Sequence, residues 1–295
     1  MQTGYFSAAW HDVKNSPGWL GKVAILGLVG LVPVFGQIVA YGYLFGWARD
    51  ISWGVHAPLP PRIFGNEDGA LYRRGFFAFV IVFVCSLMPW ALGMVWGVLA
   101  GLGAFWSARG GFAVAFGPAM MMLWLLFAAA VVLSLLFSWV GTMRMSIYGR
   151  LAPGFQFGRI WAMMRRDFGG LLRVFGMAIL LVVVTGVVVW AAILAIMLAG
   201  ALAGVVIGTP VVSTNNPFVL MATVPGLVAL VMILVVACAA LSTAAGAFSM
   251  ALIARALGYW TRQFDVPSWH GQDDPMPFEM TGGPCPAQTP PSNRG

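Results

Sequence analysis

Residues that could carry out chemistry are sparse in this sequence and lie far apart. The hydroxyl side chains inside its apolar segments are isolated from one another, and a helical hydroxyl ordinarily bonds its own backbone or packs between helices. They are Ser86, Ser134, Ser138, Thr185, Ser242, Thr243 and Ser249. The histidines, His11, His56 and His270, fall in separate polar regions without clustered carboxylates. Because an intramembrane enzyme needs ionisable or nucleophilic groups at depth, we predict that the protein is not an enzyme.

Metal and cofactor sites are not predicted either. Cys85, Cys238 and Cys285 show no CxxC pair or other ligand spacing, and the first two lie in apolar segments, where a thiol behaves as a small apolar group. The sequence has no HExxH motif, no GxSxG in a nucleophile context and no phosphate-binding loop. We therefore expect no catalytic, metal-binding or cofactor-binding residues.

The composition is that of a membrane protein. Of the 295 residues, 60% are hydrophobic and 8% are charged, whereas a soluble domain carries about 25% charged residues. Four segments lack Asp, Glu, Lys, Arg and His and exceed the roughly 20 residues that a helix needs to cross a bilayer. These predicted spans are 76–106, 113–141, 174–208 and 218–250. The predicted fold class is therefore all-α, a polytopic transmembrane helical bundle.

Basic residues concentrate in two of the connections between these spans. Residues 49–75 hold four Arg and residues 142–173 hold six, whereas 107–112 hold one and 209–217 hold none. The positive-inside rule then places 49–75, 142–173 and the C-terminal tail in the cytoplasm. The preference for Arg over Lys, with 37 Gly and many Ala, suggests a bacterium with a GC-rich genome, so the expected location is the inner (plasma) membrane. We expect the net charge of +7 to face anionic headgroups, so the lipid bilayer is a predicted partner and nucleic acid is not.

Residues 23–48 form a fifth apolar segment, for which two arrangements are open. Either the segment crosses the membrane as one span kinked at Pro33, or it re-enters by turning around Pro33 to Gly36. Re-entry keeps Lys14 and Lys22 on the cytoplasmic side, whereas a full span places them outside, so we favour re-entry. The prediction is five membrane segments, within a range of four to six.

Two short amphipathic helices are predicted at 5–16 and 155–168. In each, an apolar stripe that includes a Trp recurs at helical spacing opposite polar residues. The first stripe is Phe6, Ala9, Trp10 and Val13, and the second is Phe157, Ile160, Trp161, Met164 and Phe168. Such stripes suit helices that lie in the headgroup plane. We favour this over the alternative, cytoplasmic extensions packed on neighbouring helices.

The same two regions indicate an internal repeat. Six positions recur at identical spacing if Lys and Arg are counted as equivalent. Trp10, Lys14, Gly18, Leu20, Lys22 and Val23 correspond to Trp161, Arg165, Gly169, Leu171, Arg173 and Val174. Either the chain consists of two related halves, or the two stretches are similar only because both are suited to the membrane interface. Repeated halves are common in transporters, but they also occur in proteins that transport nothing.

The end of the chain differs in composition from the rest. Residues 264–295 are rich in Pro and Gly and lack helical periodicity, which predicts a disordered tail. The preceding residues, 1–263, are predicted to form one integral membrane domain.

Small residues four apart give the clearest packing signal. They are Gly93, Gly97 and Gly101, then Gly200, Gly204 and Gly208, and the pair Gly42 and Gly46. A groove of this kind lets another helix approach closely, either within the chain or in a homo- or hetero-oligomer.

These observations predict a non-enzymatic membrane protein that packs with itself or with a membrane partner in a structural or accessory role. The alternative is a carrier or channel for a small uncharged or lipidic molecule. Coupled carriers generally place ionisable groups in a central cavity, and here Gln37, beside the break at Pro33, is the strongly polar side chain closest to that description.

Several short motifs resemble a known family. Gly42-Tyr43, Arg49, Pro58-Leu59-Pro60 and Gly75-Phe76, with the aromatic helix around 155–166, are similar to the uncharacterised membrane family catalogued as domain of unknown function 4013. The resemblance covers roughly residues 4–262. It implies a bacterial or archaeal multi-span protein with no established activity and no catalytic residues to carry over. Apart from the resemblance, the prolines simply stiffen a cytoplasmic loop, with a binding role for that loop as the alternative.

Overall fold

The computed structural model describes residues 4–65, 69–107, 113–213 and 217–280, without the side chains of 106–117, 203–204 and 206–224. Within these ranges the regular structure is all helical, which confirms the predicted fold class. The elements are α1 (Tyr5–Lys14), α2 (Trp19–Gly30), α3 (Phe35–Ser52), α4 (Leu71–Ser107), α5 (Ala113–Tyr148), η1 (Ala152–Phe155), α6 (Phe157–Arg166), α7 (Phe168–Ser213), α8 (Pro217–Arg262), η2 (Val266–Ser268) and α9 (Pro277–Met280).

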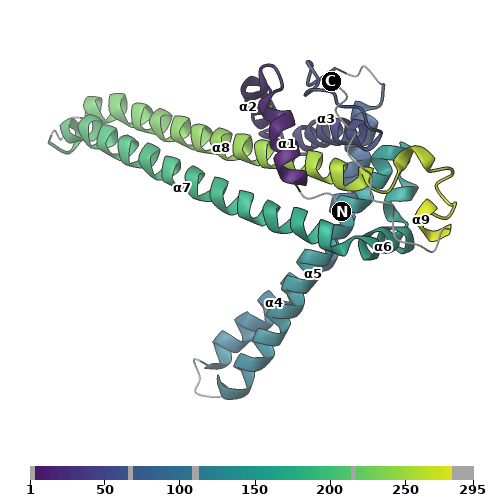
Figure 1. Ribbon diagram of the computed structural model, residues 1–295. Helices are drawn as coiled ribbons and strands as arrows, with labels where there is room; N and C mark the ends of the chain where they lie inside the picture. Colours follow the sequence, from purple (N-terminus) through teal and green to yellow (C-terminus); the bar gives the residue numbers. More distant parts are fainter. Residues whose placement is uncertain (1–3, 66–68, 108–112, 214–216, 281–295) are drawn as a thin grey trace.

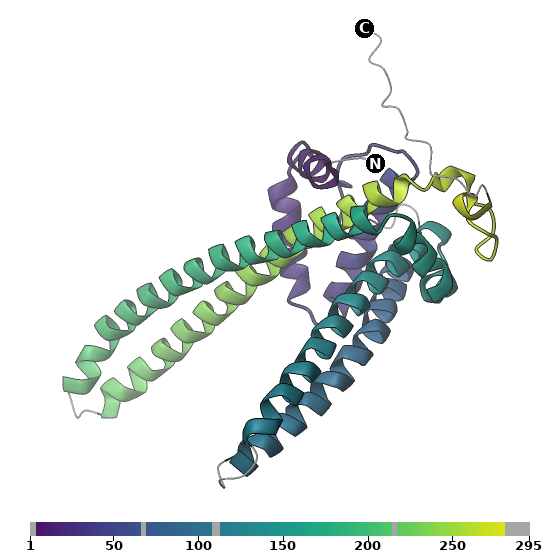
Figure 2. The same ribbon diagram turned by 60° about the horizontal axis from the view of Figure 1, so that its bottom comes forward.

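Two long helical hairpins, α4–α5 and α7–α8, extend from a shared head (Figure 1). The head consists of α1 to α3, the loop 53–65, α6, residues 263–280 and the ends of the long helices that meet them. Figure 2 shows that the hairpins diverge as they leave the head. In the described part of the chain, four stretches are long and apolar enough to cross a membrane, as predicted: Leu71–Phe105, Pro118–Tyr148, Phe168–Leu202 and Pro225–Arg262.

The long helices extend beyond the predicted spans. Helix α5 continues past Arg144 to Tyr148, and α8 continues past Arg255 to Arg262. A charged residue is expected to end a membrane segment, but both of these arginines are fully buried in the head. Because the head supplies their polar partners, the helices do not have to stop where the apolar sequence stops.

The segment 23–48 consists of two helices that meet at a sharp turn after Pro33. Val34 has a positive φ of 62°, a conformation that β-branched residues rarely adopt. The chain then folds back so tightly that a Cβ on Gly36 would lie 2.0 Å from the carbonyl oxygen of Val29. A residue without a side chain is therefore required at position 36.

Both outer ends of this hairpin reach the same loop, so residues 23–48 fold back on themselves and do not form one continuous helix. The Lys22 Nζ, near the start of α2, donates to the carbonyl of Leu59 at 2.8 Å. The Trp47 Nε1, near the end of α3, donates to the carbonyl of Ala57 at 2.9 Å. A single span would instead separate these two ends by the thickness of the membrane.

Helix α3 is the core of the head because glycines let its neighbours approach its backbone. A Cβ on Gly42 would lie 2.2 Å from the carbonyl oxygen of Leu71, and one on Gly75 would lie 1.9 Å from that of Ile38. On the opposite side, a Cβ on Gly258 of α8 would lie 2.5 Å from the Ala48 carbonyl oxygen. Helix α3 is thus clamped between α4 and α8.

The predicted glycine patterns differ in whether their glycines contact another helix of the chain. Gly42 and Gly46 lie against α4 within the chain. On α4, a Cβ on Gly93 would meet the Phe127 ring at 3.2 Å, whereas Gly97 and Gly101 face open space. In the third pattern, a Cβ on Gly200 would lie 2.3 Å from the side chain of Leu234, and the surroundings of Gly204 and Gly208 lie outside the described residues.

The two amphipathic helices are present, with slightly shorter bounds than predicted. Helix α1 buries Tyr5, Ala9 and Val13 and packs against α8, whereas Trp10 of its predicted stripe is 40% exposed. Helix α6 keeps an exposed aromatic side: Phe157 is 53% and Trp161 is 51% exposed. That side is compatible with a headgroup plane.

The junctions after α1 and α6 each contain a buried polar residue at the spacing of the internal repeat. At the spacing of the repeat, Ser16 corresponds to Asp167, and both are buried polar residues. Ser16 accepts a hydrogen bond from the Leu59 N–H at 2.9 Å. Asp167 precedes α7 and accepts one from the Gly170 N–H at 2.9 Å, which caps the helix.

The prediction of a disordered tail from residue 264 is wrong for residues 264–280. Phe264 and Val266 are buried, and Trp269 and Met276 are 8% and 2% exposed. Trp269 and Met276 cover Arg144 of α5, and Phe264 packs on Trp260 of α8. The low hydropathy and frequent proline of this segment predicted disorder, but a few aromatic side chains are enough to hold a segment in place when other helices already provide a surface for them. The rest of the predicted tail, 281–295, lies outside the described residues.

Candidate functional site

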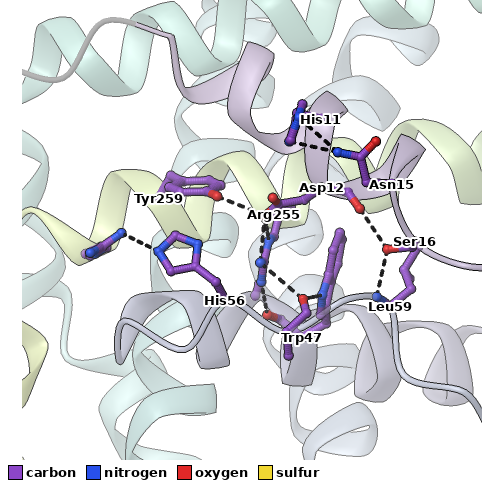
Figure 3. Close-up of polar contacts among 12 residues, drawn as sticks. His11, Asp12, Asn15, Ser16, Trp47, His56, Leu59, Arg255 and Tyr259 are labelled. Carbon is purple, nitrogen blue, oxygen red and sulfur yellow. Dashed lines mark hydrogen bonds and ion pairs between the residues drawn. The ribbon is translucent and has the colours of Figure 1, made fainter. Parts of the chain in front are cut away.

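A buried arginine holds the head together at the meeting point of α1, α3 and α8 (Figure 3). The side chain of Arg255 is completely inaccessible, and its Nε and one terminal nitrogen each lie 2.7 Å from Oδ2 of Asp12. Its other terminal nitrogen donates to the carbonyl of Trp47 at 2.9 Å. Arg255 is the single charged residue between positions 217 and 261, and every partner that it needs comes from other elements.

Two aromatic side chains flank this ion pair. The guanidinium carbon of Arg255 lies 4.3 Å from the ring centroid of Trp47 and 5.6 Å from that of Tyr259, distances that give favourable cation–π contact. The Tyr259 hydroxyl donates to the same Oδ2 of Asp12 at 2.8 Å. The carboxylate and the guanidinium are therefore satisfied within the protein.

His56 forms the outer rim of the cluster (Figure 3). One terminal nitrogen of Arg262 donates to its Nε2 at 3.1 Å. Partial burial, together with the positive charge of Arg262, lowers the pKa of His56 below its ordinary value. Nε2 can accept this hydrogen bond only when it carries no proton, so the contact belongs to the neutral histidine.

The loop after α3 is fixed to the head by its backbone. The carbonyl of Pro60 accepts a hydrogen bond from the Tyr43 hydroxyl at 2.8 Å, and that of Ala57 accepts one from Arg255 at 3.4 Å. Leu59 itself is buried, at 1% exposure. Tyr43 and Pro58-Leu59-Pro60, which carried the family resemblance, therefore meet in space. The loop 53–65, called the strap below, is held against the head by these contacts.

A second buried arginine, Arg144, anchors the segment after α8. Its guanidinium donates to Gln156 Oε1 at 2.7 Å and to the Pro153 carbonyl at 3.3 Å. It also lies 5.8 Å from the ring centroid of Trp269. Gln156 in turn donates to Asp273 Oδ1 at 2.8 Å. The contacts explain why residues 264–280 are placed against α5 and α6.

A third cluster joins the start of α7 to the end of α8. The Gln263 side chain donates to Asp167 Oδ2 and accepts a hydrogen bond from the Tyr5 hydroxyl at 3.1 Å. Burial raises the pKa of Tyr5 to about 12, and the nearby Asp167 charge adds to the shift. Tyr5 therefore stays protonated and acts as a hydrogen-bond donor.

Of the polar residues noted in the sequence, the structure brings Thr185 and Ser249 together, with their hydroxyl oxygens 3.4 Å apart. Hydroxyls in the long helices bond carbonyls of their own helix, as predicted: Ser86 to Phe83, Ser138 to Leu135, Thr185 to Leu181, Ser242 to Cys238, Thr243 to Ala239 and Ser249 to Ala245. In the described part of the chain, no three His, Cys, Asp or Glu side chains are grouped as metal ligands. Gln37 is exposed near the turn of the α2–α3 hairpin.

The buried arginines and their partners are the residues that the sequence reasoning missed. A signal was available for Arg255, because a lone charge in a long apolar stretch must find a partner when it is buried. No comparable signal identifies Asp12, which the helical periodicity places on the polar side of α1.

Comparison with known proteins gives one family. The model of a family described as a protein of unknown function (DUF4013) matches residues 25–194. This range begins in α2 and ends within α7, so it includes α3 and the strap but excludes Asp12 and Arg255. No curated protein and no solved structure matches the chain.

Proposed function

The chain belongs to the DUF4013 family, and since that membership assigns no activity, we propose that it is a non-enzymatic protein of the bacterial inner membrane that packs with itself or with a membrane partner. Its two hairpins would supply the membrane contacts, and its head would hold them apart. The observation that carries this proposal is the divergence of α4–α5 from α7–α8 (Figure 2).

The exposure of the hairpins supports the proposal. The most apolar windows of α7 and α8 contain no buried residue, and those of α4 and α5 have 11% of their residues buried. Lipid can cover such faces without a large penalty, so exposure alone does not require a protein partner. The divergence of the two hairpins argues for a protein partner, because the packed head holds the two helix pairs apart and leaves the inner face of each pair available for contact with another protein.

Helix α4 also offers a groove for close approach. Gly97 and Gly101 lie one turn apart, and a Cβ on either residue would have no other atom within 4 Å. Small residues at this spacing favour helix association in membranes. Gly93, one turn earlier, already packs on α5. The groove therefore continues from an internal contact onto an uncovered surface.

The polar groups of the head support a non-catalytic role and a cytoplasmic orientation. Asp12, Arg255 and Tyr259 bind one another, so none is poised to act on a substrate. The Arg-rich regions 49–75 and 142–173 both lie at the head end, and by the positive-inside rule this supports a cytoplasmic head. The transport alternative gains no support from Gln37, which lies near an exposed turn.

The test is site-specific photo-crosslinking in native membranes. A photoreactive residue at Ala104, which is exposed and lies on the same side of α4 as Gly97 and Gly101, should give adducts with a second copy or with another membrane protein. Filling the groove with G97L/G101L should abolish those adducts. The exposed Ala91 is on another side of the same helix, and A91L adds similar bulk there, so this control should keep them. Adducts with lipid only, or adducts that survive G97L/G101L, would overturn the proposal.

A further inference from the structure

A basic cavity lies where α3, α4 and α5 enter the head. Its volume is about 220 Å³, and its walls include Arg49, Arg73 and Arg74, together with backbone and side-chain atoms of 145–149. A water molecule occupies about 30 Å³ in the liquid, so the cavity has room for a phosphate group with bound water. We propose that this cavity binds the phosphate of an anionic phospholipid headgroup.

Three arginines line this one small space, and their positive charge favours an anion. The buried Arg74 donates to the Gly42 carbonyl at 3.2 Å, which fixes its position, and Arg49 pairs with Asp50 at 3.2 Å. Both also have interactions with other parts of the protein. Among the residues that the structure describes, no hydrogen bond or ion pair engages Arg73. Its guanidinium is therefore the one most available to a ligand, and arginine pairs well with phosphate oxygens.

The backbone adds to the positive potential. Ala70 lines the cavity and Leu71 begins α4, so the first turn of that helix forms part of the wall. The N-terminal end of a helix carries partial positive charge and favours anions. This contribution reinforces the three arginines and does not replace them.

The position of the cavity indicates a lipid as the source of the phosphate. Directly after Arg73 and Arg74, α4 becomes apolar, and Phe76 is 51% exposed. A phospholipid with its phosphate in the cavity would place its acyl chains along this apolar surface of α4. Basic pockets where membrane helices meet the polar phase are suited to anionic headgroups. All the lining residues lie within 25–194, the range that matches the family.

The inference is tested by thermal unfolding of the purified full chain in neutral detergent micelles. Phosphatidylglycerol should raise the midpoint saturably, and phosphatidylcholine should not. Because one Arg near a headgroup contributes about 1 kcal/mol, R73Q should require about fivefold more phosphatidylglycerol for half-saturation. The control is R150Q, which removes an exposed Arg that does not line the cavity. R150Q has the same net charge as R73Q, and it should bind phosphatidylglycerol like the wild type.

Two other results would overturn the assignment. Equal weakening by R73Q and R150Q would mean that general surface charge attracts the lipid. Saturable stabilisation by inorganic phosphate, without any by phosphatidylglycerol, would mean that the phosphate comes from a free anion. Neither result bears on the crosslinking test of the hairpins, so the two proposals fail separately.

Discussion

The guanidinium of Arg255 and the carboxylate of Asp12 join the last long helix to the first helix of the chain across 243 residues of sequence. Two nitrogens of Arg255 share one carboxylate oxygen at 2.7 Å, and its third contact is the carbonyl of Trp47 in α3. One buried side chain thus fixes α1, α3 and α8 relative to one another.

Removing the negative charge of this pair should destabilise the head. The D12N variant leaves Arg255 buried without its counter-charge, which costs about 3–5 kcal/mol in comparable buried pairs. The measurement is unfolding of the purified protein in micelles. The matched control is D50N, because the Asp50–Arg49 pair is about 30% exposed on each side and should contribute at most about 1 kcal/mol. Equal effects of D12N and D50N would contradict a special role for the buried pair.

The pKa of His56 should lie below 6.5, and R262Q should raise it. Burial and the Arg262 charge both disfavour the imidazolium, so the folded state binds this proton less readily than the unfolded chain. The stabilisation from neutral His56 is therefore present above pH 6.5 and decreases as the pH falls through that value. Histidine-selective NMR titration measures the pKa, and loss of a signal in H56N assigns it. An unchanged value in R262Q would show that Arg262 does not act on the imidazole.

Adding one methyl group at the α3–α4 contact should disrupt the head. In G75A the new Cβ would lie 1.9 Å from the Ile38 carbonyl oxygen, so the helices must separate, and overpacking of this kind costs about 1–3 kcal/mol or more. In G97A the methyl group enters open space, and the variant should unfold like the wild type. Thermal unfolding compares the two. If G75A were as stable as G97A, the close approach of α3 and α4 would be wrong.

Re-entry of 23–48 predicts that cysteines at Lys14 and Arg62 are labelled from the same side of the membrane. Both residues are exposed, and the chain between them returns to the same loop. A membrane-impermeant thiol reagent on intact cells and on inverted vesicles makes the measurement, with the native cysteines replaced. R109C, in the connection between α4 and α5, should react from the opposite side. Labelling of K14C and R62C from opposite sides would mean that 23–48 crosses the membrane once.

Residues 264–280 should contribute to stability through Trp269. This side chain is 8% exposed and covers Arg144, so W269A should cost about 3–5 kcal/mol, as other large truncations of buried aromatic residues do. The control is W53A, because Trp53 is 43% exposed in the loop after α3 and should be tolerated much better. Limited proteolysis provides a second readout: W269A should expose new cleavage sites after residue 262, and W53A should not.

The positions of the long helices and of the turn at Pro33 were predictable, because one kind of residue determines each of them. Segments without charge identified the four long apolar helices in the described part of the chain, and Pro33 marked the turn of the α2–α3 hairpin. The contacts of Gly42 with α4 also followed the glycine pattern. In each case a local property, apolar length or the lack of a side chain, restricts the structure strongly.

The head was less predictable because its polar groups find partners far away in the sequence. Asp12 looks like part of a solvated face until Arg255 and Tyr259 are brought beside it. Trp269 looks like part of a disordered tail until α5 and α6 provide a surface for it. Composition describes each segment alone, whereas burial here depends on surfaces that other segments create.

The clamped position of α3 also determines the order in which the protein can be completed during synthesis. Helix α3 and its strap emerge early, and α4 can cover one side at once. The side of α3 that faces Gly258 must wait until the ribosome has made α8, more than 200 residues later. Until then the Asp12 carboxylate and the Trp47 carbonyl lack their common partner, so a chain that stops before Arg255 leaves both of these polar groups without it.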